Sequence, residues 1–166
     1  SFHWNGGKVL SDMDDAETEE ALKKFIETVN DSDVEVFAVQ DYWTFDWILE
    51  LRKYLRDHPE ELKKTVLPGM ELRVECATNF RLNIHAIISD RVSDQELRDF
   101  RSELKIRWSG DETKNVSDET LKEYAKGLDA SKAREHGFDD PSTLDDAMLL
   151  KLGSMTVEVT RDSLSK

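Results

Sequence analysis

The sequence predicts an α+β fold with roughly five strands in a mixed or mainly antiparallel sheet, a central hairpin over 70–77 and 81–89, and helices packed on the sheet. Two observations support this prediction. Residues 70–77 and 81–89 alternate between apolar and polar side chains and are separated by a short polar stretch, a pattern typical of an antiparallel hairpin. Elsewhere, apolar residues recur every three or four positions, which is the period of a helix with one buried face.

The first half of the chain contains signals for helices and for strands. Asn5-Gly6-Gly7 between short apolar stretches predicts a small N-terminal hairpin. Apolar residues on both faces of 34–40 predict a central strand that is covered on both sides. Thr44 is a good N-cap for the helix that follows it, and Pro59 suits the first turn of another. The helices expected here span 14–29, 45–57 and 59–66, and a turn over 67–69 follows them.

The second half predicts three further helices and two further strands. Ser93 and Glu96 form a capping-box pattern, and Gly127 weakens the middle of its helix, so that a break there stays open. Ser142 is expected to cap the last helix and Gly153 to end it. The helices expected here span 94–104, 118–135 and 143–152, and the strands span 104–108 and 155–161. Residues 109–115 are typical of an internal linker.

The length of 166 residues fits a single globular domain over 1–166, and excision of this domain from a longer chain stays open because the first residue is Ser. No run of about 18 apolar residues exists, so we expect no membrane span. The one cysteine, Cys76, favours a reducing compartment, and we therefore expect an intracellular protein of the cytoplasm or nucleus.

The formal net charge of −13 bears on the kind of partner. Phosphate attraction requires clustered Lys and Arg, so we expect neither an anionic membrane surface nor nucleic acid as the main partner. A basic protein partner or a cation fits this charge better, although a high net charge also serves solubility alone. Acidic side chains are dense in 11–17 and 138–146, where they are typical of helix N-termini.

The most unusual stretch of the sequence is Asp41-Tyr42-Trp43-Thr44-Phe45-Asp46-Trp47. In one interpretation the aromatic side chains belong to the core, with Phe2 and Trp4 of the N-terminal hairpin covering Phe45 and Leu49. In the other, they form a partner-binding patch, because aromatic anchors are enriched at protein interfaces. That patch would consist of Trp43, Phe45 and Leu49, with Asp41 and Asp46 at its rim.

A second candidate site is the polar face of the central hairpin. Its basic residues could hold a phosphate or carboxylate, because an arginine offers two parallel donors. The possible anion-binding residues are Arg73, Arg81, His85 and Arg107, with Lys105 as a further member. The alternative is ion pairing across the strands with Glu71 and Glu75.

Signatures of catalysis and of cofactor binding are missing from the sequence. No CxxC, Gly-rich phosphate loop, GxSxG or HExxH pattern occurs, so we expect no cofactor and no metal site. The sequence therefore favours a non-catalytic protein-interaction domain, such as an inhibitor, an immunity-type protein or a regulatory adaptor. The alternative is a small enzyme that acts on a phosphate-containing substrate at the basic sheet face. The partner's identity and the oligomeric state stay open.

Overall fold

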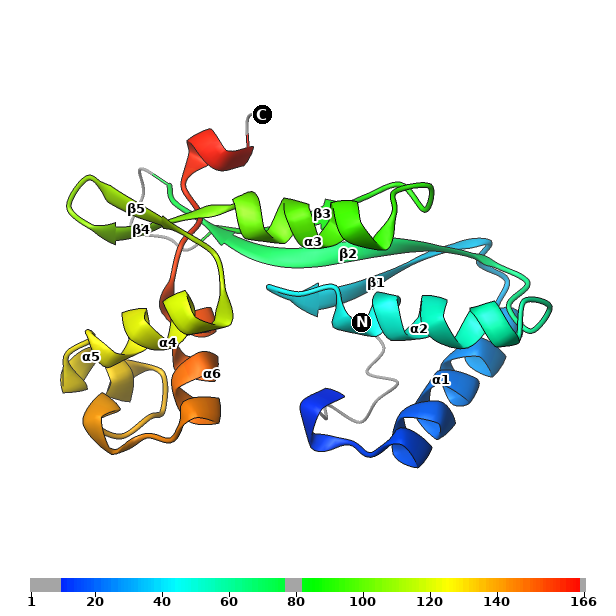
Figure 1. Ribbon diagram of the computed structural model, residues 1–166, viewed down its shortest axis with the longest axis horizontal. Helices are drawn as coiled ribbons and strands as arrows, with labels where there is room; N and C mark the ends of the chain where they lie inside the picture. The colour runs from blue at the N-terminus through cyan, green and yellow to red at the C-terminus, as the bar shows by residue number, and fades with distance from the viewer. Residues whose placement is uncertain (1–9, 77–81, 165–166) are drawn as a thin grey trace. The chain divides into compact units, whose positions relative to one another are not determined.

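The computed structural model describes residues 10–76 and 82–164 of the chain (Figure 1). Within these ranges the α-helices are α1 (Asp15–Asn30), α2 (Asp46–Asp57), α3 (Asp94–Glu103), α4 (Asp118–Lys126), α5 (Ala130–Glu135) and α6 (Asp146–Thr156). The strands are β1 (Val36–Tyr42), β2 (Thr65–Val74), β3 (Leu82–Ile87), β4 (Lys105–Ser109) and β5 (Glu112–Asn115). The expected N-terminal hairpin and the tip of the central hairpin, residues 77–81, lie outside the described residues.

The α+β class is confirmed, but the single five-stranded sheet is wrong. The strands form a three-stranded sheet in the order β1-β2-β3 and a two-stranded sheet of β4 and β5. Among the helices of the described residues, none is both long and apolar enough to cross a membrane.

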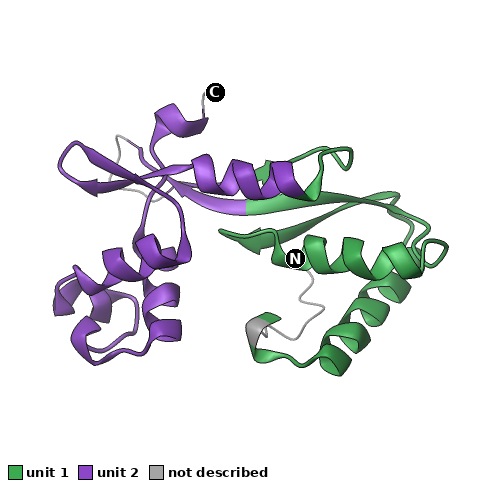
Figure 2. Cartoon of the chain, viewed as in Figure 1, with its two compact units in different colours: residues 1–70, 86–94 green, residues 71–85, 95–166 purple. Residues whose placement is uncertain are grey.

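The chain divides into two compact units, residues 1–70 with 86–94 and residues 71–85 with 95–166 (Figure 2). The boundary falls inside β2 and again inside β3. The single-domain organisation stays a prediction.

In the first unit, α1 forms as the sequence predicts. Asp14 is its N-cap and accepts a hydrogen bond from the Glu17 backbone N–H, while the Glu17 side chain accepts one from the Asp14 backbone N–H. One stripe of the helix is buried, and it consists of Ala21, Leu22, Phe25, Ile26 and Val29. This burial confirms the apolar face expected for 14–29.

Strand β1 runs parallel to β2. The Thr65 N–H donates to the Glu35 carbonyl, and a Cβ at Gly69 would lie 2.7 Å from the Gln40 side chain. The residue numbers of the paired positions therefore increase together along both strands. Helix α2 connects the two strands, as parallel pairing requires. The prediction of a central, covered strand over 34–40 is wrong, because β1 is an edge strand in which only Val39 is buried.

Residues 59–69 do not form the helix (59–66) and turn (67–69) predicted for them. The Asn30 side chain donates to the Glu61 carbonyl and accepts from the Lys63 N–H, and these bonds satisfy backbone groups that a helix would otherwise pair. Leu67, Pro68 and Gly69 lie within β2. Gly69 has no Cβ to collide with Gln40, so the tertiary contact overrides the local turn signal.

Arg52 joins α2 to residues 90–94 in the same unit. Its guanidinium donates to the carbonyls of Val92 and Asp90 at 2.9 and 3.0 Å and to the Asp94 carboxylate at 2.9 Å. Arg56, one turn later, has a single 3.7 Å contact with Asp94. The loop before α3 is therefore fixed by three hydrogen bonds from one side chain.

In the second unit, Val159 lies between two strands. It forms a parallel bridge to Val74 at the end of β2 and an antiparallel bridge to Ile106 in β4. All three of these side chains are buried. The strand predicted over 155–161 is thus reduced to a short extended segment, because Met155 and Thr156 belong to α6.

Residues 109–115 are not a linker. β4 pairs antiparallel with β5, and Arg107 is opposite Thr113. Gly110 has a φ of 55°, a value that few other residues adopt without strain, and it allows the tight connection between these strands. The dense polar composition that suggested a linker is that of an exposed hairpin.

The helices of the second unit confirm some predictions and correct others. Leu97 is the buried residue of α3, which forms close to the predicted span 94–104. The helix predicted over 118–135 breaks at Gly127 into α4 and α5. The last helix begins after Asp145, not Ser142, because the Asp145 carboxylate accepts from the Met148 N–H.

Gly153 lies inside α6 and does not end it. A Cβ at this position would stand 2.2 Å from the Leu121 carbonyl oxygen of α4. The glycine is therefore needed for the close approach of two helices and not for a C-cap.

Candidate functional site

The aromatic stretch after β1 is core and not surface. Trp43 is 1% exposed and Phe45 is 3% exposed. The expectation of an exposed patch containing these two side chains is therefore corrected, because the close-packed interior takes up both rings. Of the other members, Leu49 is half-buried and Asp46 is exposed.

The start of α2 is held by an unexpected residue. The Asp41 carboxylate accepts a hydrogen bond from the Trp47 backbone N–H at 2.9 Å, whereas Phe45, at the N-cap position, makes no side-chain cap. Trp43, which lies between Asp41 and Phe45, has a φ of 66°, a value that is rare for a bulky residue. The backbone turn at Trp43 returns the chain toward Asp41. Thr44 is therefore not the cap that the sequence predicted.

Asp41 is also the described carboxyl group whose ionisation is most disfavoured. The pKa of Asp41 is raised to about 7, mainly by burial. The hydrogen bond from Trp47 opposes this shift, and the nearby charge of Asp46 contributes to it. An N-cap is expected at the residue that immediately precedes a helix. The sequence therefore did not indicate Asp41, six residues before Trp47, as the residue that accepts from the start of α2.

The polar face of the central hairpin is partly as predicted. The Asn83 side chain donates to Glu71 at 2.8 Å, so these residues share a face, and alternation along the strands places Arg73 and His85 on the same side. Arg73 is half-buried, and its Nε and Nη1 atoms are buried without hydrogen-bond partners. His85 is exposed. Arg81 lies outside the described residues.

Arg107 belongs to a different group of residues. Its Nη2 donates to both carboxylate oxygens of Glu75 at 2.9 and 3.0 Å, which is the ion pairing weighed as the alternative to anion binding. Its Nη1 contacts the Gly110 carbonyl at 3.3 Å and Asp111 at 3.8 Å. The anion-binding role expected of Arg107 is therefore not supported by its present contacts.

A hollow of about 550 Å³ adjoins this ion pair, and we call it the strand-end pocket. Its wall is formed by charged side chains, namely Lys105, Arg107, Arg161, Glu75, Asp111 and Asp162. Cys76, Thr113 and Thr160 complete it. The pocket was not predicted, because its walls come from three stretches of the sequence that only the bridges around Val159 bring together.

The acidic segments act at helix N-termini, as predicted from their sequence. Asp14, Asp140 and Asp145 are N-caps in the described structure. Among the residues that the structure describes, no group of three or more His, Cys, Asp or Glu side chains is arranged to hold a metal ion.

The comparisons with known proteins give no further guide to this site. No protein-family model, no curated protein and no solved structure matches the chain.

Proposed function

We propose that this protein is a non-catalytic interaction domain that binds a basic protein partner through an acidic surface on its first unit. The observation that supports the proposal is a group of residues that runs from the end of α1 to the first residue of β1, which we call the acidic–apolar patch. It consists of Asp31, Asp33, Val34, Glu35 and Val36.

The apolar part of the patch is unusually exposed. Val34 is 50% exposed and Val36 is 54% exposed, although large apolar side chains in the described structure are mostly buried. Exposed apolar residues that are rimmed by charge are a typical composition for a protein interface, with an apolar centre and a polar edge.

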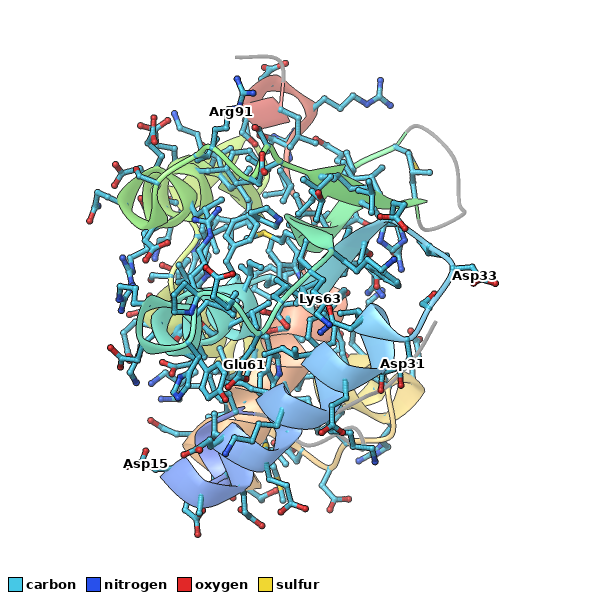
Figure 3. All side chains as sticks on the ribbon, turned by 90° about the vertical axis from the view of Figure 1, so that its right-hand side faces the viewer. Asp15, Asp31, Asp33, Glu61, Lys63 and Arg91 are labelled. Atoms are coloured by element: carbon cyan, nitrogen blue, oxygen red, sulfur yellow. The ribbon has the colours of Figure 1, made fainter. Side chains whose placement is uncertain are left out.

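The charge around the patch is strongly negative. From Asp12 to Glu35 the sequence has ten acidic and two basic residues, and all but one of the ten carboxylates are exposed. Two of these carboxylates are paired with lysines, Glu19 with Lys23 and Glu35 with Lys64, each at 2.6 Å, and the others leave the surface negative. Figure 3 shows Asp15, Asp31 and Asp33 at the surface of this face of the molecule. A partner rich in Lys and Arg would be attracted to this surface and would associate faster at low salt.

The proposal is tested by affinity capture from an extract of the source organism, followed by titration of any captured protein against purified variants. Val34→Ser with Val36→Ser removes the apolar centre, and Asp31→Asn with Asp33→Asn removes charge at the rim. We expect the first variant to weaken binding by about tenfold or more through faster dissociation, and the second to slow association.

Matched controls lie in the second unit. Met148→Ser removes an apolar side chain of similar exposure, 48%, and Glu135→Gln with Asp139→Asn removes two exposed charges. The proposal fails if no protein is captured, or if the captured protein binds the patch variants as tightly as it binds the controls.

A further inference from the structure

We propose that the strand-end pocket of the second unit binds the phosphate group of a small molecule, through the positive charges of Lys105 and Arg161. The proposal concerns binding alone. It is independent of the acidic–apolar patch, which belongs to the first unit.

Two of the three cations that line the pocket are available to a ligand. Arg107 is neutralised by its hydrogen bonds to both oxygens of Glu75. Arg161 uses only its Nε, which donates to the Glu75 backbone carbonyl at 3.1 Å, and it makes no ion pair with the described residues. Lys105 is exposed and makes no ion pair with them either. Two positive charges therefore line the pocket without a carboxylate partner.

The backbone holds Lys105 and Arg161 close together. The Thr160 N–H donates to the Lys105 carbonyl at 2.8 Å, so Arg161 follows directly after a residue that is bonded to Lys105. The Nε bond to Glu75 fixes the direction of the Arg161 guanidinium. A site whose groups are already placed loses less entropy on binding than a flexible one.

The hydrogen-bond donors of Arg161 and Lys105 suit a phosphate group. An arginine whose two terminal nitrogens are available can donate to two phosphate oxygens, and a lysine can reach a third. Thr113 and Thr160 add hydroxyl groups, and the Thr160 hydroxyl makes only a 3.4 Å contact with Ser163. The volume of about 550 Å³ falls within the usual range for small-ligand sites and exceeds what a bare phosphate needs. The pocket therefore suits a small phosphate ester.

The acidic residues of the pocket limit the affinity. Glu75 is neutralised by Arg107, but Asp111 and Asp162 also line the wall. Because repulsion from these carboxylates opposes the two cations, we expect a dissociation constant for inorganic phosphate on the order of 1 mM, weakening as salt is added.

The experiment is a titration of the full isotope-labelled chain with inorganic phosphate, followed by amide NMR shifts, with chloride holding the ionic strength constant. We expect saturable shifts at Lys105, Thr113 and Arg161. Lys105→Gln with Arg161→Gln should weaken binding by about tenfold or more, because both charges are lost. Glu75→Gln should strengthen it, because Arg107 then becomes available as a third cation.

The matched control is Lys126→Gln with Arg134→Gln, which removes one exposed lysine and one exposed arginine from α4 and α5 of the same unit. In each variant, the amide resonances of residues distant from the substitutions report whether the fold is intact. The absence of saturable shifts in the unmodified chain would overturn the proposal. Equal weakening in the two double variants would also overturn it, since that result means non-specific attraction to overall charge.

Discussion

Asp41 lies in surroundings that favour its neutral form, although it caps a helix. Burial raises the pKa of Asp41 to about 7 from an ordinary value of 3.8. Between these two values the folded protein binds more protons at this site than the unfolded chain does. The free energy of unfolding should therefore fall as pH rises from about 4 to about 7.

The Asp41→Asn variant tests this effect. The amide oxygen can still accept the Trp47 N–H, but the site no longer titrates. Relative to the unmodified protein, the variant should gain about 2–3 kcal/mol of stability as pH rises from 5 to 8, because roughly two pH units separate pH 5 from the raised pKa of about 7. Urea unfolding of both proteins at pH 5 and pH 8 measures this difference. A variant whose stability relative to the unmodified protein is the same at both pH values would show that Asp41 is ionised normally in the fold.

Arg52 and Arg56 test the difference between a half-buried, multiply bonded arginine and an exposed one. The Arg52 side chain is 21% exposed and donates three hydrogen bonds, whereas that of Arg56 is 62% exposed and has one 3.7 Å contact. Arg52→Lys should lower the free energy of unfolding by about 1–2 kcal/mol, because an ammonium group cannot reproduce the fork. Arg56→Lys should change it by less than about 0.5 kcal/mol. Similar losses from both substitutions, measured by urea unfolding, would contradict this account.

At the scale of elements, two glycines near helix ends look alike in sequence and differ in structure. The Gly153 position in α6 touches the Leu121 backbone, with a Cβ distance of 2.2 Å to its carbonyl oxygen. At Gly127 the nearest atom to a Cβ would be the Tyr124 carbonyl oxygen at 3.5 Å, and φ is an ordinary −84°.

Gly153→Ala should therefore destabilise the protein by about 1–3 kcal/mol, because α4 and α6 must separate. Gly127→Ala should be neutral or stabilise by up to about 1 kcal/mol, since alanine restricts the unfolded chain without a clash. Thermal unfolding of the two variants gives the comparison. If Gly153→Ala were as stable as Gly127→Ala, the close contact between α4 and α6 would not exist in solution.

The elements that the sequence predicted well are those whose signals are local. α1 has its apolar stripe between Asp15 and Asn30 and its N-cap at the preceding residue, Asp14, and it forms as expected. Residues 59–66 had a helical composition, but Asn30 bonds to the Glu61 and Lys63 backbone from a distant part of the chain. No inspection of 59–66 alone would reveal that competition.

At the scale of the whole molecule, the net charge of −13 is the dominant electrostatic property. Like charges are closer together in the folded state than in the unfolded state, so their repulsion lowers stability at low ionic strength. Raising NaCl from about 0.02 to 0.3 M shortens the screening length from about 20 to 6 Å, and we expect the melting temperature to rise by several degrees.

Exposed ion pairs oppose this effect only weakly. Pairs such as Lys23–Glu19 contribute little at the surface and are screened by the same salt. Scanning calorimetry over a salt series checks the prediction. A melting temperature that falls steadily with salt would mean that such pairs stabilise the fold more than the net charge destabilises it.

The sequence by itself determined the α+β class, the apolar face of the first helix and the net negative charge, and it marked Gly127 as a weak point of its helix. These properties depend on periodicity, composition and neighbours within a few residues. The tertiary structure alone decided that Trp43 and Phe45 are core, that Arg107 pairs with Glu75, and that Lys105 and Arg161 line one pocket. Each of these outcomes depends on a partner far away in the chain, and the free energy of such contacts is fixed only when packing brings both partners together.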